Sequence, residues 1–348
     1  MNLSDLKRNA YMLRGSDAKR GYMRWWHSFQ GICPTTQETR TFFVEYSILN
    51  PALGTSQPIL GQHPYYKRHG LKPSYLCIKA GVFPEPGDSG LQLQAYYPLT
   101  SLQVAQDPFY MQFEDCVYSE NRISGSIDIS DEVARHRSLM TDAGSFIWDL
   151  EVHKAVACHT GYIANAFFTA VHALESFWHG EGIRTFFRGT IILNGVTYEV
   201  TPETSYGYAD KHWGRSYNQP CCPKFLFFPM RRRILMQLTY TGEDFEYHFG
   251  RPLTLSRCKW KVKETNKRFI WHFKAQNRTS VVRISGSCSK EQMMPLLYES
   301  PDGKVSDIPL WEGGNATGTI ELYRRIGGSL ELIDRLQFEN GLCAYQRS

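Results

Sequence analysis

The sequence lacks the features that mark several large classes of protein. No stretch approaches about 18 consecutive apolar residues, so no transmembrane helix is expected. The N-terminal residues 1–20 carry charges throughout, so we expect no secretory signal and a cytoplasmic location. We find no phosphate-cradling glycine loop, no nucleophile elbow, no His-Glu-x-x-His helix and no dinucleotide fingerprint. A reaction without a cofactor, or plain ligand binding, is what remains.

Metal and nucleic acid are also not expected. The nine cysteines include no Cys-x-x-Cys pair, and their odd number predicts reduced thiols rather than a complete disulfide framework. Cys221 and Cys222 have no histidine or further cysteine at ligand spacing nearby, so no metal site is predicted. The net charge of +5 is too diffuse to require nucleic acid. The run Arg231-Arg232-Arg233 is interpreted as a solvated strand end or a weak contact with an anionic surface, such as a peripheral membrane contact.

Aromatic residues and alternating patterns are what the chain has in abundance. Aromatic residues make up 14% of it, and they favour strands and line apolar pockets. Alternation places Phe43, Glu45 and Ser47 on one face of a strand, with apolar residues on the other. Many such short segments, and the hairpin signal Asn194-Gly195, predict an all-β protein of antiparallel barrels or sandwiches with a few short helices.

The length and the rhythm of the chain suggest two domains. A chain of 348 residues exceeds a comfortable single core, and we predict β domains at 1–204 and 205–348. Residues 50–73 are rich in proline and are expected to form a loop long enough to be a lid or rim. Residues 161–180 have apolar residues near helical spacing, which indicates an amphipathic helix or an irregular aromatic patch.

The densest chemistry lies between residues 206 and 217. The segment Tyr206-Gly-Tyr-Ala-Asp-Lys-His-Trp-Gly-Arg-Ser-Tyr217 combines a carboxylate, a lysine, a histidine and a tryptophan. If it is a strand, Asp210 and His212 share one face, and Lys211 and Trp213 share the other. The combination is typical of a functional site.

This segment resembles the signature of the tocopherol cyclase-like family, which is related to carotenoid hydratases and lipocalin-type Diels–Alderases. Arg24-Trp25-Trp26-His27-Ser28-Phe29 stands where the family carries an early aromatic strand, and Ala157-Cys158-His159-Thr160-Gly161 resembles its Cys-His-Gly segment. The resemblance covers most of the chain and implies a duplicated lipocalin-like architecture. After Tyr217 the sequence departs from the family, because it runs at once into Cys221-Cys222-Pro223.

The resemblance implies an acid at position 210. A carboxylic acid in a poorly hydrated aromatic pocket has a raised pKa and can deliver a proton near neutral pH. Protonation of an isoprenoid double bond gives a carbocation, which aromatic faces stabilise. Capture by a phenol oxygen then closes a ring, whereas capture by water gives hydration. The structural alternative is that Asp210 pairs with Lys211 or Arg215 and that Trp213-Gly214 only turns a barrel corner.

Two sets of residues are therefore candidates for a site. The catalytic candidates are Asp210, His27 and His159, the histidines as proton relays or as structural residues. The substrate-binding candidates are Trp25, Trp26, Glu45, Tyr206, Tyr208, Lys211 and Trp213. For Glu45, a surface position is the commoner explanation.

The predicted ligand is apolar, of the prenylquinol, carotenoid or polyene type, and is expected between the two β domains. The favoured reaction is acid-catalysed cyclisation or hydration without a cofactor. A pericyclase that only folds its substrate and a carrier or sensor without turnover are the alternatives. The sequence leaves turnover, the ligand's identity and the oligomeric state open.

Overall fold

The structure is a computed structural model of the 348-residue chain. It describes residues 3–54, 56–159, 176–203, 205, 207–215, 236–240, 243–247, 257–276, 278–305 and 309–346. The chain divides into two compact units. The first comprises Met1–Val82, Leu91–Phe228 and Leu297–Asp307, and the second comprises Phe83–Gly90, Pro229–Leu296 and Ile308–Ser348.

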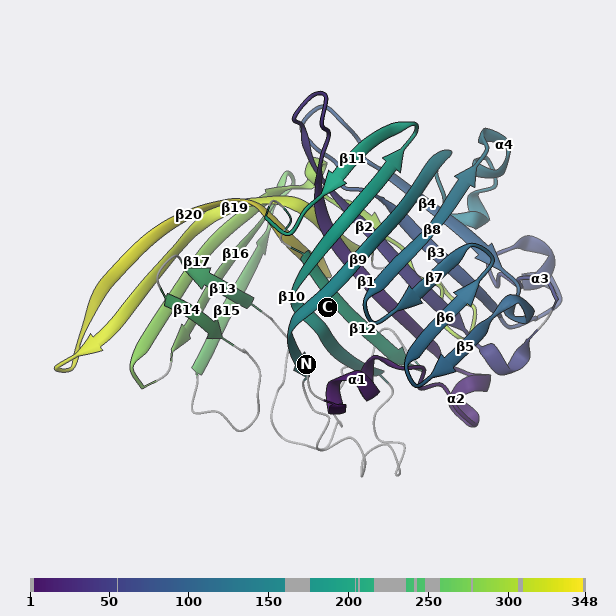
Figure 1. Ribbon diagram of the computed structural model, residues 1–348, viewed down its shortest axis with the longest axis horizontal. Coiled ribbons are helices and arrows are strands. Elements are labelled where there is room, and N and C mark those ends of the chain that lie inside the picture. The colour runs from purple at the N-terminus through teal and green to yellow at the C-terminus, as the bar shows by residue number, and fades with distance from the viewer. Residues whose placement is uncertain are drawn as a thin grey trace. The chain divides into compact units, whose positions relative to one another are not determined.

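The described part of the first unit contains one 12-stranded antiparallel sheet (Figure 1). The strands are β1 (Tyr22–Ile32), β2 (Thr39–Leu49), β3 (Tyr75–Val82), β4 (Leu91–Tyr97), β5 (Gln103–Gln106), β6 (Phe109–Phe113), β7 (Cys116–Ser119), β8 (Arg122–Ile129), β9 (Gly144–His159), β10 (Ser176–Leu193), β11 (Val196–Val200) and β12 (Gly207–Gly214). Their order is β4-β3-β2-β1-β11-β10-β9-β8-β7-β6-β5, and β12 pairs with both β1 and β10. Strand β12, which the predicted boundary assigns to the second domain, therefore belongs to this sheet. The predicted domain limits themselves stay a prediction.

The sheet closes into a barrel around one core. Apolar side chains from most of its strands form a single buried cluster, which includes Trp25, Val44, Ile78, Leu93, Tyr118 and Trp148. Burying one such side chain stabilises the fold by about 1.5–3 kcal/mol. The outer edge of β4 is covered, because two of its backbone N–H groups donate to side chains of the segment 141–142. The backbone N–H of Gln92 donates to Asp142 Oδ2 at 2.8 Å, and that of Gln94 donates to Thr141 Oγ1 at 2.8 Å.

The helices of the first unit are short, and the first two precede strand β1. The described ones are α1 (Leu3–Asn9), α2 (Ser16–Lys19), α3 (Pro64–Arg68) and α4 (Asp131–Ala134), with 3-10 turns at Pro51–Leu53, Leu99–Ser101 and Arg137–Leu139. Helix α3 and one 3-10 turn fall within the segment predicted as a proline-rich loop.

Two local predictions have clear outcomes. The Asn194-Gly195 hairpin is confirmed, because these residues join β10 to β11 with φ of 48° and 82°, as a type I′ turn requires. Of the two alternatives predicted for residues 161–180, an amphipathic helix or an irregular aromatic patch, the helix is wrong for residues 176–180, which begin strand β10. There, pairing with β9 and β12 overrides the helical spacing. Residues 160–175 lie outside the described residues.

The described part of the second unit is also built from antiparallel strands. A two-stranded sheet holds β13 (Met236–Tyr240) and β14 (Glu243–Tyr247). A six-stranded half-barrel sheet holds β15 (Arg257–Glu264), β16 (Arg268–Gln276), β17 (Ser280–Ser289), β18 (Met294–Leu296), β19 (Leu310–Ile326) and β20 (Ser329–Gln346), with a 3-10 turn at Lys290–Gln292. Phe269 and Cys288 are among its most deeply buried side chains. The predicted fold class, all-β with two lipocalin-like halves and a few short helices, is confirmed.

Candidate functional site

Strand β12 divides the predicted motif between the two faces of the barrel wall. Trp213 belongs to the barrel core, and Lys211 is fully buried on the same side. Tyr208, Asp210 and His212 occupy the alternate positions and contact one another on the outer face. The predicted division of faces is thus confirmed, and Trp25 and Trp213 do not share a face with Asp210.

On the outer face, Asp210 begins a row of side chains that crosses five strands. The pairing register places Trp26 of β1 opposite both Asp210 and Glu45, Glu45 opposite Lys79 of β3, and Lys79 opposite Gln94 of β4. Each of the five is no more than 8% exposed. We call Asp210, Trp26, Glu45, Lys79 and Gln94 the outer row. Three charged groups in a buried row are costly unless they are paired, so their contacts matter.

The Asp210 carboxylate is held by its neighbours along β12. The Tyr208 hydroxyl donates to Asp210 Oδ2 at 2.7 Å, and His212 Nε2 lies 3.5 Å from the same oxygen. Burial lowers the pKa of His212 below its usual value, and the nearby charge of Arg24 lowers it further. At neutral pH the imidazole is therefore neutral, and it can accept a proton.

Lys211 and Arg215, the two cations that the sequence offers as partners of Asp210, make other contacts. Arg215 donates to Asp17 Oδ1 at 2.7 Å, and the Lys211 ammonium group points to the opposite side of the wall. The group that accompanies Asp210 is therefore a histidine two residues along the strand, which sequence spacing places on the same face.

An aromatic platform lies beside Asp210. Trp26, its cross-strand neighbour, stacks on Phe43 of β2 with ring centroids 5.1 Å apart and an interplanar angle of 9°. Indole and phenyl faces present negative electrostatic potential, which stabilises a nearby cation. The face that carries the carboxylate thus also carries aromatic rings.

Glu45 is fully enclosed rather than a surface residue. Its Oε2 lies 3.4 Å from Arg24 and accepts a hydrogen bond from the Tyr298 hydroxyl at 3.1 Å. The Lys79 ammonium group lies 3.8 Å from the centroid of the Tyr298 ring and donates to the Leu297 carbonyl at 3.2 Å. A cavity of about 20 Å³ adjoins Glu45 and Lys79. That volume accommodates a single water molecule rather than a polyene.

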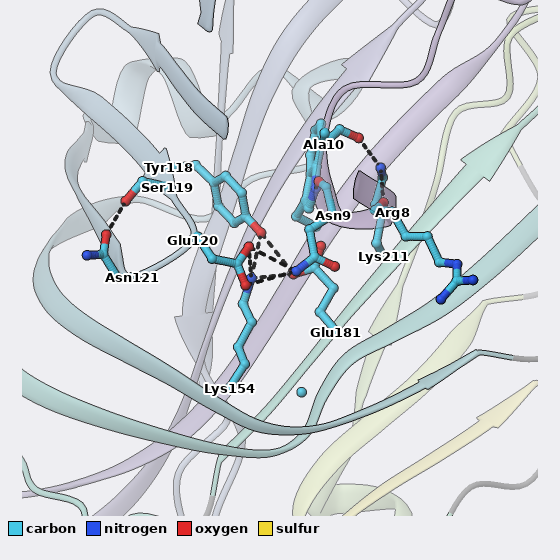
Figure 2. Close-up of polar contacts among 12 residues, drawn as sticks. Arg8, Asn9, Ala10, Tyr118, Ser119, Glu120, Asn121, Lys154, Glu181 and Lys211 are labelled. Carbon is cyan, nitrogen blue, oxygen red and sulfur yellow. Dashed lines mark hydrogen bonds and ion pairs between the residues drawn. The ribbon is translucent and has the colours of Figure 1, made fainter. Parts of the chain in front are cut away.

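Lys211, Trp25 and Trp213, which are also predicted site residues, lie on the interior face of the barrel. Lys211 donates to the carbonyls of Arg8, at 2.7 Å, and Ala10, and its ammonium group lies 5.2 and 4.9 Å from the ring centroids of Trp25 and Trp213. Burial lowers the pKa of Lys211 to about 7. Figure 2 shows this lysine beside the N-terminal residues that cover it. The Trp25 indole also donates to this segment, at the Asn9 carbonyl.

His27 faces the same interior and is completely buried. Its ring lies 5.4 Å from the ring of Tyr118 and 6.3 Å from that of Phe187. Neither ring nitrogen makes a well-formed hydrogen bond with a described residue, and the Val44 backbone is the polar group that interacts with the ring. Burial, reinforced by the charge of Lys154, lowers the pKa of His27 to about 3. His27 is thus neutral at any ordinary pH and lies on the face opposite to Asp210.

The interior also holds an ion pair that sequence reasoning missed. Lys154 Nζ lies 2.9 Å from Glu181 Oε2 and donates to the Tyr118 hydroxyl at 3.0 Å, and both charged side chains are fully buried (Figure 2). Burial disfavours the charged form of Lys154, but Glu181 and then Glu120 outweigh it and raise its pKa. Lys154 occupies an inward position two residues after Val152, so strand alternation was the available signal.

Two of the predicted site residues, His159 and Tyr206, have no described side chain. His159 ends β9 and pairs in register with His179, but its side chain is outside the description. Tyr206 lies outside the described residues, as does the departure from the family pattern after Tyr217.

Comparison with known proteins leaves the family open. No protein-family model matches the chain, and no curated protein matches it. A crystal structure from Nitrosomonas europaea, described provisionally as AttH, aligns with 98% of this chain and 96% of its own, at 10% identity and a TM-score of 0.36. Kievitone hydratase from Nectria haematococca aligns with 94% of this chain and 89% of its own, at 10% identity and a TM-score of 0.31. At these TM-scores neither similarity supports a shared family or function, and the tocopherol cyclase-like resemblance stays a prediction.

Within the described ranges, no helix is both long and apolar enough to cross a membrane.

Proposed function

We propose that this protein binds a small apolar ligand of the isoprenoid or polyene type and adds a proton to one of its double bonds at Asp210. The observation that supports the proposal is the contact of Asp210 with Tyr208 and His212 beside the Trp26–Phe43 platform. An acid, a base and aromatic faces on one side of one sheet are what cyclisation or hydration of an alkene requires.

The proton can complete a cycle between two residues of β12. In this scheme the protonated carboxyl of Asp210 gives its proton to an alkene carbon, and the π electrons of the double bond form the new C–H bond. The carbocation faces the rings of Trp26 and Phe43. Water, or a phenol oxygen of the ligand, then attacks the cation, and neutral His212 accepts the proton released from that oxygen. The proton then returns from His212 Nε2 to Asp210 Oδ2, which lie 3.5 Å apart, and this restores the protonated carboxyl group.

The test separates the acid from the shape of the site. Asp210→Asn keeps the size and the hydrogen bond from Tyr208 but removes the transferable proton. With a prenylated hydroquinone and a carotenoid as probes, turnover should fall by about 10²–10⁴-fold, because general acid catalysis contributes that much. The dissociation constant should change little. Asp149→Asn, an exposed carboxylate of β9, is the matched control and should leave both unchanged.

Other outcomes would redirect the proposal. Conversion that survives Asp210→Asn would contradict acid catalysis and favour a pericyclase that acts by folding its substrate. Tight binding of the probes without any conversion would favour a carrier. If neither the prenylated hydroquinone nor the carotenoid binds, the proposed ligand class is wrong.

A further inference from the structure

A second concave surface lies in the first unit and shares only Leu297 with the lining of the cavity beside Glu45. It has a volume of about 690 Å³, within the range of small-molecule sites. It is formed where helix α3 meets the segment that follows α4, with apolar contributions from Leu297 and Val305. We call it the basic groove, because five of its lining side chains are basic: His63, Arg68, Arg135, His136 and Arg137.

Among the described residues that line the groove, none is acidic. The guanidinium groups of Arg68, Arg135 and Arg137 are exposed, and none is in an ion pair with a described residue. The sequence around α3 explains part of this, because no aspartate or glutamate occurs from residue 46 to residue 84. The described side chains therefore give the groove a positive potential.

The types of side chain indicate which anion fits. Arginine presents a planar fork of donors that matches the oxygens of a phosphate group, and paired arginines bind phosphate through charge-assisted hydrogen bonds. Tyr65 of α3 also lines the groove and is 52% exposed, so an aromatic face lies next to the cations. Helix α3 holds this face in place, because His63 caps its start and Arg68 Nε donates to the Pro64 carbonyl at 3.2 Å.

We propose that the basic groove is a binding site for a phosphate-bearing anion, held by Arg68, Arg135 and Arg137. The proposal is independent of the chemistry at Asp210, because it rests on other residues of the unit. The segment predicted from sequence as a rim thereby supplies one wall of an anion site. A free phosphate compound and a phosphomonoester lipid headgroup share this chemistry.

The experiment uses the full chain and two probes, inorganic pyrophosphate and vesicles. Calorimetric titration should show that pyrophosphate binds the unmodified protein and that affinity falls as salt is raised. The triple variant Arg68→Gln/Arg135→Gln/Arg137→Gln should weaken binding by about tenfold or more, since charge-assisted hydrogen bonds to the anion are lost.

The matched control removes the same charge from another surface. Lys259→Gln/Lys261→Gln/Lys263→Gln changes three exposed residues of β15, and both triple variants lower the formal net charge from +5 to +2. The control should bind pyrophosphate as the unmodified protein does. An equal loss in both variants would show general charge attraction and overturn the proposal. All substituted side chains are exposed, so folding should be retained, and circular dichroism checks this.

The vesicle arm distinguishes the two sources of the anion. Sedimentation with phosphatidylcholine vesicles that contain phosphatidic acid, but not with pure phosphatidylcholine, would assign the groove to a lipid headgroup if the groove variant abolishes it. Binding of pyrophosphate without sedimentation would assign it to a soluble phosphate compound. Binding of neither probe would overturn the site.

Discussion

The two faces of the barrel wall in the first unit treat their charges differently. Inside the barrel, Lys154 and Glu181 form a fully buried pair, and Lys211 is bound by backbone carbonyls. On the outer face, Asp210 and Glu45 accept hydrogen bonds from tyrosines and lie next to partly exposed His212 and Arg24. The same strands, β1 and β12, supply both faces.

This difference predicts which face of the wall affects stability and which affects the proposed proton transfer. Buried charges inside the barrel neutralise one another or are bound by backbone carbonyls, so they stabilise one arrangement of the core. The outer face has the carboxyl group of Asp210 in contact with the neutral imidazole of His212, beside the stacked rings of Trp26 and Phe43. Inner-face substitutions should therefore affect stability most, and outer-face substitutions should affect activity most.

The largest expected effect on stability comes from breaking the interior pair. Lys154→Met leaves Glu181 as an uncompensated buried carboxylate and should lower the free energy of unfolding by about 3–5 kcal/mol. Urea-induced unfolding measures the change. The double variant Lys154→Met/Glu181→Leu should recover most of the loss, because removing both charges removes the cost of burying them.

A surface pair provides the control for that measurement. Arg122 and Asp149 are 2.9 Å apart, but both side chains are 57% exposed. Arg122→Gln should cost less than about 1 kcal/mol. If Lys154→Met cost no more than Arg122→Gln, the interior pair would not have the role in stability that its burial implies.

The second prediction concerns the pH dependence of stability that the buried His27 of the inner face produces. The pKa of His27 is about 3 in the folded barrel, against about 6.5 in an unfolded chain, so the unfolded state binds the extra proton between these values. Stability from this group is complete above pH 6.5 and is lost as the pH falls toward 3. Between pH 7 and pH 5, the loss from His27 alone should be about 2 kcal/mol.

His27→Phe should remove that part of the pH dependence, whatever it does to stability at pH 7. The measurement is the free energy of unfolding at several pH values for the unmodified protein and the variant. His272→Phe, at an exposed position of β16, should leave the slope nearly unchanged. Equal slopes for the unmodified protein and His27→Phe would contradict a neutral, buried His27.

The smallest expected effect concerns Glu45 of the outer row. Glu45→Gln keeps an acceptor for the Tyr298 hydroxyl but removes the charge that faces Arg24. We expect a loss of about 1–2 kcal/mol in the free energy of unfolding, because the lost contact is one partly buried charged hydrogen bond. Glu38→Gln, whose pair with Arg40 is half exposed, should lose less. The reverse order would mean that burial does not strengthen the contact of Glu45 with Arg24.

Local patterns predicted more of the strands than of the site. The faces of β2, the hairpin at Asn194-Gly195 and the faces of β12 follow from alternation and turn chemistry, which act over a few residues. The ion pair of Lys154 with Glu181 could not be predicted in full, because its partners lie on different strands and Glu181 follows a segment with helical spacing. The sequence predicts residues 50–73 only as a loop that could be a lid or rim and does not predict the basic groove, since Arg135 and Arg137 reach it from a distant part of the chain.

The all-β class, the segment rich in titratable groups and the side of the strand on which each of them lies follow from the amino-acid sequence, because successive side chains of a strand point to opposite faces. Which of those sides forms the barrel interior depends on how the strands pack together. Which cation each carboxylate meets depends on strand register across the sheet, and register is fixed by the packing of the whole barrel rather than by neighbouring residues.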